Sequence, residues 1–172
     1  MLTEWDKHST SRSSKHMEKA FLSMIEEHQN IIHKVCHVYR DRKEDQEDLF
    51  QDIILQLLKA YPDFRKESKV STWMYRIALN TAIAVFRKNR VPLDFKATIP
   101  VELHPTDSAT TFDNQDRMFR ALRTLTQSEK AIITLYLDDF SYREIAEITG
   151  ISENYVGVKI NRIKNKLKNI LN

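Results

Sequence analysis

The chain has 172 residues, of which 41% are hydrophobic and 30% are charged, and its formal net charge is +3. This composition supports a buried core and excludes a wholly disordered chain. The chain has only two glycines, Gly150 and Gly157. They are too few for the tight turns of a β-sandwich or barrel, and they exclude both common glycine-rich phosphate loops. The length fits one ordinary domain or two small ones, and the composition predicts an all-α protein.

Cysteine content and hydropathy exclude further classes of protein. Cys36 is the one cysteine, so an intrachain disulfide and a CxxC zinc site are excluded. The first twenty residues lack the apolar run of a signal peptide. No stretch approaches the roughly 20 apolar residues that a membrane span needs. We therefore expect a soluble, cytoplasmic protein with no membrane partner.

The N-terminal half predicts a tail followed by a helical bundle. Residues 1–16 are serine-rich and without periodicity, which predicts a flexible tail. Helical spacing of apolar residues then predicts three helices, over about 17–39, 45–61 and 71–88. Leu49, Phe50, Ile53, Ile54, Leu57 and Leu58 form the apolar stripe of the second, which Pro62 ends. Together the three helices predict a bundle spanning residues 17–90.

Residues 91–115 differ from the segments on either side. They contain three of the four prolines, carry a net charge of −3 and show no helical period. A segment of this length is long for a connection inside one compact domain. We therefore expect an acidic, flexible linker that separates two domains.

The last domain, residues 116–172, has the pattern of a helix-turn-helix. Two capping boxes, Thr126 with Glu129 and Ser141 with Glu144, predict helix starts. Gly150 follows the second of these helices at the position where a left-handed residue closes a helix. Ser152 is a good N-cap for the last helix. A short helix, a glycine turn and a capped second helix form the bihelical unit that reads DNA.

The last helix has an apolar stripe and a basic row beside it. The stripe is Val156, Ile160, Ile163, Leu167 and Ile170, and the row is Tyr155, Lys159, Arg162 and Lys166. A basic row of this kind suits a helix that lies along a phosphate backbone. The alternative is a solvated basic face whose cations favour the helix dipole. Gly157 costs about 1 kcal/mol of helix stability relative to Ala, and either permits close approach to DNA or a partner, or is simply tolerated.

The N-terminal domain carries two zones of opposite charge. Residues 41–52 include six acidic and two basic side chains, whereas residues 65–90 include seven basic side chains and one acidic. Trp73, Tyr75 and Phe86 lie within the basic zone, and Phe64 directly precedes it. Aromatic residues among cations are typical of single-strand binding, although such aromatics are more often core residues.

Three ordered motifs resemble those of bacterial sigma-70 family sigma factors. The run DLFQD, Asp48 to Asp52, is similar to the start of the helix that binds core polymerase in that family. The run STWMYRIALN, Ser71 to Asn80, is similar to the segment that follows it. Leu125 to Glu129 and the helix-turn-helix resemble the second conserved domain. The order, length and linker resemble the minimal, extracytoplasmic-function (ECF) type.

The resemblance implies three sets of binding residues. The residues expected to bind the β′ clamp of core polymerase are Asp48, Leu49, Gln51 and Asp52. The residues expected to bind the −10 promoter element, as single-stranded DNA, are Lys66, Lys69, Trp73, Arg76, Asn80, Arg87 and Lys88. The residues expected to bind the −35 element, as duplex DNA, are Ser152, Glu153, Asn154, Tyr155, Val158, Lys159, Arg162 and Lys166. The family also implies the polymerase β flap and an anti-sigma factor as partners.

Two points qualify this assignment. Asn154-Tyr155 and Gly157-Val158 depart from the family's frequent Gly-Thr and Lys-Ser, so the −35 base preference is not given by the resemblance. Trp73 and Arg76 also fit a role that only braces the bundle.

Two other classes of function are weighed. A stand-alone helix-turn-helix regulator would use the N-terminal bundle for dimerisation or ligand binding, and its free form would bind a palindromic duplex. An enzyme or metalloprotein finds little support: His33 and His37 share a helix face near Cys36, but no further ligand has recognisable spacing. We expect no cofactor, no metal and no catalytic residues.

Overall fold

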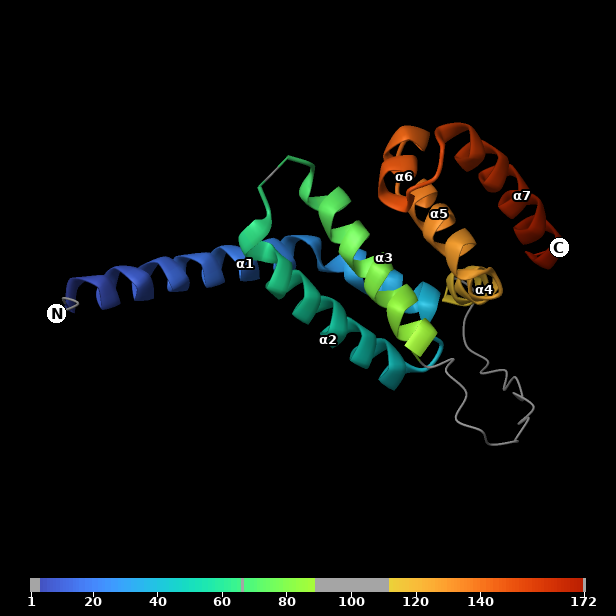
Figure 1. Cartoon of the computed structure of the whole chain (residues 1–172). Coiled ribbons are helices and arrows are strands. Elements are labelled where there is room, and N and C mark those ends of the chain that lie inside the picture. Colours follow the sequence, from blue (N-terminus) through green and yellow to red (C-terminus); the bar gives the residue numbers. More distant parts are fainter. Residues whose placement is uncertain (1–3, 66, 89–111, 172) are drawn as a thin grey trace.

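The computed structural model describes residues 4–65, 67–88 and 112–171, and every regular element in these ranges is helical. The N-terminal module consists of α1 (Glu4–Tyr39), α2 (Lys43–Ala60), a 3-10 turn (Tyr61–Asp63) and α3 (Val70–Lys88). The C-terminal module consists of α4 (Phe112–Arg123), α5 (Gln127–Leu137), α6 (Tyr142–Thr149) and α7 (Glu153–Leu171). The predicted all-α class is confirmed, and Figure 1 shows the two modules side by side. No described helix is long and apolar enough to cross a membrane.

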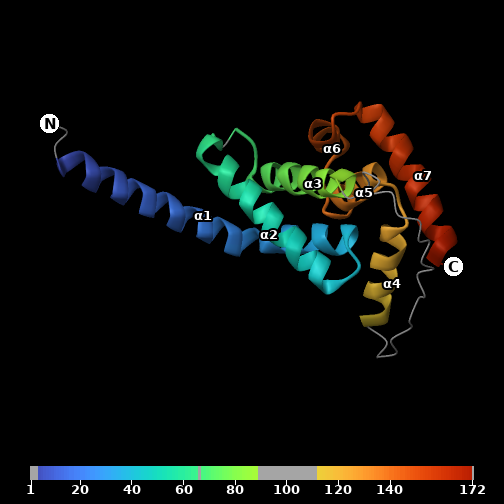
Figure 2. The same cartoon turned by 60° about the horizontal axis from the view of Figure 1, so that its bottom comes forward.

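Helix α1 begins earlier than the sequence pattern predicts. The expected flexible tail of residues 1–16 is instead helical from Glu4 onward, and this end of α1 projects from the rest of the molecule (Figures 1 and 2). Residues 4–16 contain neither Gly nor Pro, so nothing in their backbone chemistry stops the helix. Likewise, α4 begins at Phe112 rather than at 116. Most of the expected linker of residues 91–115, namely 91–111, lies outside the described residues.

The core of the N-terminal module lies where α1, α2 and α3 pack against one another. Ile53 and Leu57 of α2, Ile32 of α1 and Met74 of α3 are all completely buried in this core. One predicted core residue, Leu58, is instead half exposed. The reason is geometric: Leu57 already occupies the inward position, and a helix turns its next residue by about 100°.

Local chemistry fixes the helix ends of the C-terminal module. Both predicted capping boxes form, with Thr126 and Ser141 each accepting from the backbone N–H three residues on, while Glu129 and Glu144 bond back to the cap N–H. Gly150 ends α6 with φ +75°, a left-handed conformation that glycine adopts without steric cost. The inner stripe of α7 is buried except at Ile170, which is 48% exposed because it lies in the last turn.

The two modules are in contact. Helix α1 packs against α4 and α5, and α3 packs against α5 and α6. Figure 2 shows α3 lying beside α5, while α7 lies on the far side of the C-terminal module. The contacts therefore involve α1 and α3 but leave α7 exposed on its outer face.

Candidate functional site

The outer face of α2 combines acid and apolar side chains. Asp48, Gln51 and Asp52 are exposed, as predicted for a docking helix. Leu55 and Leu58 follow on the same side of the helix and are 47% and 49% exposed. None of these acids makes an ion pair with another described residue. An acidic helix face with two exposed leucines suits a basic partner helix.

The structure corrects one residue of this set. Leu49 is 1% exposed and belongs to the core, so it positions α2 and does not face a partner. Leu55 and Leu58 take its place; Leu58 was missed because it was assigned to the core stripe, and Leu55 was assigned to no surface. Their spacing from Asp48, seven and ten residues, was the available signal, since both distances return to the same helix face.

One face of α3 carries residues predicted to bind the single-stranded −10 element, and we call it the strand face. It consists of Trp73, Arg76, Asn80 and Arg87, which are spaced by three, four and seven residues. Arg76, Asn80 and Arg87 are exposed, and Trp73 is half-buried. Of the remaining predicted −10 residues, Lys66 lies outside the described residues. Lys88 closes α3, but its side chain also lies outside them.

Trp73 belongs to an aromatic cluster at the start of α3. Its ring stacks on Phe64 with centroids 4.6 Å apart and an interplanar angle of 29°, and Tyr61 lies 6.4 Å away. The cluster holds the loop that precedes α3 against the bundle, which is the bracing role weighed above. Because Trp73 is only half-buried, part of the ring also stays accessible for stacking.

Two cations of the predicted −10 set are engaged by α6. Lys69 Nζ lies 3.2 Å from Glu144 Oε1, and Arg76 Nη2 donates to the Glu147 carbonyl at 3.4 Å. The hydrogen bonds from the Ser141 backbone and side chain, followed by that from Lys69, hold the pKa of Glu144 below its usual value. Arg76 and Asn80 also line a cavity of about 130 Å³ between α3 and the α5–α6 pair.

Helix α7 presents its predicted reading residues to solvent. Glu153, Asn154 and Arg162 are exposed, and Tyr155 and Val158 are 45% and 47% exposed. These residues start near the N-terminus of the helix, which is the end that enters the major groove in helix-turn-helix proteins.

Ser152, which directly precedes α7, and Lys159 of α7 complete this surface. Ser152 Oγ accepts from the Tyr155 N–H at 3.4 Å, in keeping with its predicted cap, and Lys159 Nζ lies 5.4 Å from the Tyr155 ring centroid. Asn161 and Asn165 are exposed on the same outer side but were not predicted, because the basic row drew the assignment. An Asn side chain can pair with an adenine edge, so these two belong to the candidate reading surface.

Lys166, predicted to contact DNA, has a partner inside the domain. Its Nζ lies 2.6 Å from Glu129 Oε1, and the Glu129 side chain is only 7% exposed. Burial raises the pKa of Glu129, but the bonds from Lys166 and Thr126 outweigh burial and hold that pKa below its usual value. Lys166 therefore forms an ion pair that links α7 to α5. A phosphate contact would have to compete with that ion pair.

Gly157 has a specific packing role. A Cβ placed there would lie 3.3 Å from Tyr142 Cε2, so the glycine leaves room for the Tyr142 ring against α7. Tyr142 is the first residue of α6 and is 40% exposed. The close contact at Gly157 is therefore made within the domain, between the two helices of the helix-turn-helix, and not with DNA or a partner.

The histidines of α1 have packing partners. The His33 ring stacks on Phe50 with centroids 4.7 Å apart, and His37 lies against Phe119. Cys36 is buried, and burial raises the pKa of its thiol to about 12. Within the described residues, no group of three His, Cys, Asp or Glu side chains is placed to hold a metal ion.

These features define a two-module helical protein with a helix-turn-helix in one module and an exposed, acidic and partly apolar helix face in the other. Two family models match in the same order, Sigma-70 region 2 over residues 24–91 and Sigma-70 region 4 over residues 115–167, and together they cover more than half of the chain. The chain belongs to the sigma-70 family of RNA polymerase sigma factors and is of the ECF type. It directs promoter recognition by RNA polymerase and transcription initiation, and it is not itself an enzyme.

Similar proteins agree with this assignment. The ECF RNA polymerase sigma factor SigX of Bacillus subtilis is 27% identical over 151 residues, covering 81% of this chain and 77% of SigX. The ECF RNA polymerase sigma-E factor of Escherichia coli is 27% identical over 172 residues, covering 92% and 90%. The structure of RpoE from Bartonella quintana with the anti-sigma factor NepR has a TM-score of 0.66 at 20% identity, covering 91% and 97%, and so shares the fold. CnrH in complex with the cytosolic domain of CnrY has a TM-score of 0.63 at 19% identity, covering 90% and 88%.

Proposed function

We propose that this sigma factor divides its work among three surfaces. The outer face of α2 docks on the β′ clamp of core polymerase, the strand face of α3 captures the −10 element as a single strand, and α7 reads the −35 duplex. The C-terminal module also meets the β flap. The protein acts in the cytoplasm, where polymerase and template lie, and requires no cofactor.

The outer face of α2 is the observation that carries the proposal. Asp48 and Asp52 are exposed without an ion-pair partner among the described residues, directly beside the half-exposed Leu55 and Leu58. Exposed carboxylates next to an apolar strip fit a partner that offers cations and an apolar ridge.

The chemistry of α3 supports melting. Trp73 offers a partly accessible π-face at the start of the helix, and Asn80 and Arg87 follow on the same side. Taking a base out of the stack costs a few kcal/mol, which contacts to the extruded base have to offset. A ring for stacking, an amide for hydrogen bonding and cations for phosphate supply those contacts.

An anti-sigma factor is proposed as a further partner. Its support is that RpoE, a protein with the same fold, is described in complex with the anti-sigma factor NepR.

Run-off transcription tests the proposal. Purified protein is added to core polymerase on genomic promoter fragments, and we expect discrete start sites that core alone does not produce. The variant with Asp48→Lys and Asp52→Lys should abolish these products while keeping its helical content by circular dichroism. Absence of start-site selection by the wild-type protein would overturn the proposal.

A further inference from the structure

Asparagine is concentrated in α7. Four of the nine asparagines of the chain lie within the 19 residues of this helix, namely Asn154, Asn161, Asn165 and Asn169. Asn forms helices less readily than Ala, Leu or Lys, because its side chain competes for backbone hydrogen bonds. Helix formation therefore does not account for their number, and their use has to be sought at the surface of the helix.

Three of these asparagines lie on one line along the outer side of α7. Asn154, Val158, Asn161 and Asn165 follow one another at steps of four, three and four residues, so they share one helix face. We call this line the amide ridge. Val156, which starts the buried stripe, is two positions from both Asn154 and Val158, a rotation of about 200°. The ridge therefore runs opposite the buried stripe.

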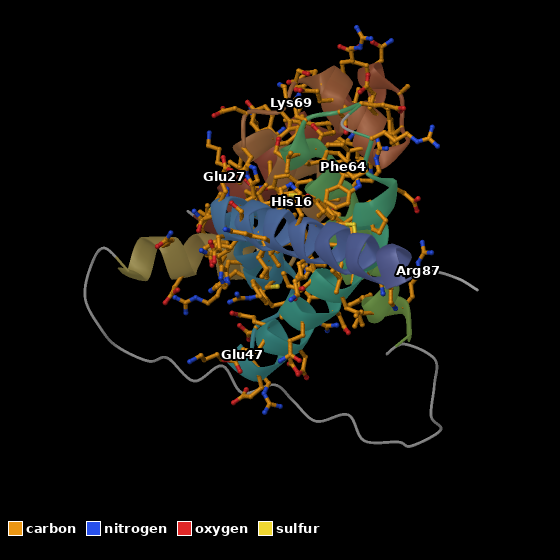
Figure 3. All side chains as sticks on the ribbon, turned by 90° about the vertical axis from the view of Figure 1, so that its left-hand side faces the viewer. His16, Glu27, Glu47, Phe64, Lys69 and Arg87 are labelled. Carbon is orange, nitrogen blue, oxygen red and sulfur yellow. The ribbon has the colours of Figure 1, made fainter. Side chains whose placement is uncertain are left out.

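The amide ridge is open to solvent. Its three asparagines are exposed, and Val158 is 47% exposed. Within the described residues, none of the three amide side chains forms a hydrogen bond with another residue. The main contacts of α7 are with α4, α5 and α6, and the N-terminal module meets the C-terminal module elsewhere, where Lys69 lies against α6 (Figure 3). The donors and acceptors of the ridge are thus available to a ligand.

Cations lie on both flanks of the amide ridge. Lys159 and the exposed Arg162 lie on one flank, and the exposed Lys164 and Lys168 lie on the other. After Glu153, α7 contains no acidic residue. Phosphates line both edges of the major groove, so cations on two flanks place the ridge between them, against the edges of the bases.

The side chains of the ridge have the chemistry that recognises A·T pairs. The Asn carboxamide accepts from adenine N6 and donates to adenine N7, and an apolar side chain contacts the thymine methyl group. Guanine is most often read by Arg or Lys, and the ridge contains neither. In zinc fingers, three side chains spread over about seven residues of a helix contact three successive bases. Asn154, Val158 and Asn161 have a comparable spread.

We propose that the amide ridge makes the −35 module specific for a run of about three A·T pairs, with Asn154 and Asn161 each reading an adenine and Val158 contacting a thymine methyl group. Asn165 lies one turn further from the end of α7 that enters the groove, so its contribution is smaller. The inference deepens the proposed role of α7 and rests on it. It supplies the base preference that the family resemblance leaves open, since positions 154 and 158 are among those that depart from the family's frequent residues.

Selection from random duplexes tests the preference. The full-length protein is incubated with short duplexes of random sequence at low salt, which strengthens phosphate contacts, and the bound DNA is sequenced. The wild type should enrich a run of A·T pairs. Asn161→Ala should lose about tenfold of the preference at one position of the run, the value for one bidentate contact. Because Ala favours the helix, loss of folding does not explain such a result, and circular dichroism checks it.

The matched control is Asn169→Ala. It removes the same exposed amide from the last turn of α7, away from the end that enters the groove, and should keep the preference of the wild type.

Base analogues separate direct contact from DNA shape, because A·T runs also have a narrow minor groove. 7-Deazaadenine lacks the N7 acceptor but keeps its Watson–Crick edge, and uracil lacks the methyl group of thymine. Substituted one position at a time in the selected duplex, 7-deazaadenine should weaken binding by the wild type about fivefold, the value for one hydrogen bond, and should leave Asn161→Ala unaffected at one of these positions. Uracil should likewise weaken binding by the wild type but not by Val158→Ser.

The outcomes separate this inference from the proposed function. Enrichment of G·C pairs, no enrichment, or an unchanged preference in Asn161→Ala overturns the inference. Equal losses with 7-deazaadenine in the wild type, Asn154→Ala and Asn161→Ala also overturn it, because the run would then be read through its shape. None of these measurements uses polymerase, so start-site selection in run-off transcription stands whatever they give. Conversely, an A·T preference without start-site selection keeps the amide ridge as a DNA reader and overturns the proposed function.

Discussion

The outer face of α2 and the strand face of α3 belong to the same module, but they differ in whether the C-terminal module contacts them. The acids of α2 stay in solvent beside Leu55 and Leu58, whereas Lys69 and Arg76 are bonded to α6. Both surfaces carry charge, so charge alone does not explain the difference. What separates them is position: α3 packs against α5 and α6, where Glu144 and the Glu147 carbonyl meet the two cations, whereas the main contacts of α2 are with α1, α3 and the 3-10 turn.

The largest effect is expected from reversing the charge of α2. Asp48→Lys with Asp52→Lys should abolish binding to core polymerase, because a basic partner would then meet like charge. Co-purification with core enzyme measures it. The matched control is Glu26→Lys with Glu27→Lys, which makes the same charge change on exposed positions of α1 and should leave binding intact. Retained binding by the α2 variant would remove this face from the docking surface.

Neighbouring leucines of α2 sharpen the same contrast. Leu49→Ala should lower the free energy of unfolding by about 2–5 kcal/mol, as expected for a buried leucine. Leu55→Ala should change stability by less than about 0.5 kcal/mol and weaken polymerase binding, because it is 47% exposed on the outer face. Urea unfolding and a polymerase titration separate the two effects. A large loss of stability in Leu55→Ala would assign that residue to the core.

Two lysines of α7 distinguish structure from DNA contact. Lys166→Ala should destabilise the protein by about 1–3 kcal/mol, because it leaves the buried Glu129 carboxylate without its cation. Lys159→Ala should leave stability nearly unchanged and lower the salt dependence of promoter binding by about 0.9 in slope, the value for one phosphate contact. An unchanged slope in Lys159→Ala would remove it from the phosphate set.

The Glu129–Lys166 pair also predicts a pH dependence. The folded-state pKa of Glu129 lies below its usual value of 4.5, so the pair stabilises the fold above that pH and the stabilisation is lost as pH falls through the folded-state pKa. The difference in stability between wild type and Lys166→Ala should therefore shrink in acid. Unfolding at neutral pH and at a pH well below 4.5 measures it, and a constant difference would contradict the assignment.

The smallest effect concerns Gly157. Gly157→Ala gains up to about 1 kcal/mol from helix propensity, but the new Cβ would crowd the Tyr142 ring at 3.3 Å. We expect the full gain in a Tyr142→Ala background and a smaller gain in the presence of Tyr142. Thermal unfolding of the four proteins measures the coupling, and additive changes would mean that Tyr142 moves aside without cost.

Local signals made much of the fold predictable. The capping boxes at Thr126 and Ser141 and the left-handed Gly150 involve residues within four positions of one another, so their geometry is encoded in short stretches. The buried stripe of α7 follows from the helical period in the same way. The predictions failed where a choice depended on neighbours: Leu49 was assigned to the docking set as well as to the core stripe, and Leu58 to the core stripe, but Leu49 is buried and Leu58 is half exposed.

The amino-acid sequence by itself determined the helical class, the order of the two modules, the helix-turn-helix and the acidic character of α2, because each depends on composition, period or contacts close in the chain. Only the tertiary structure decided that Lys166 serves Glu129, that Gly157 makes room for Tyr142, and that Asp138 joins α5 to Lys34 and Tyr75. These pairs bring together residues from different helices. The register between packed helices is set by how whole surfaces fit, and no short stretch of sequence contains that information.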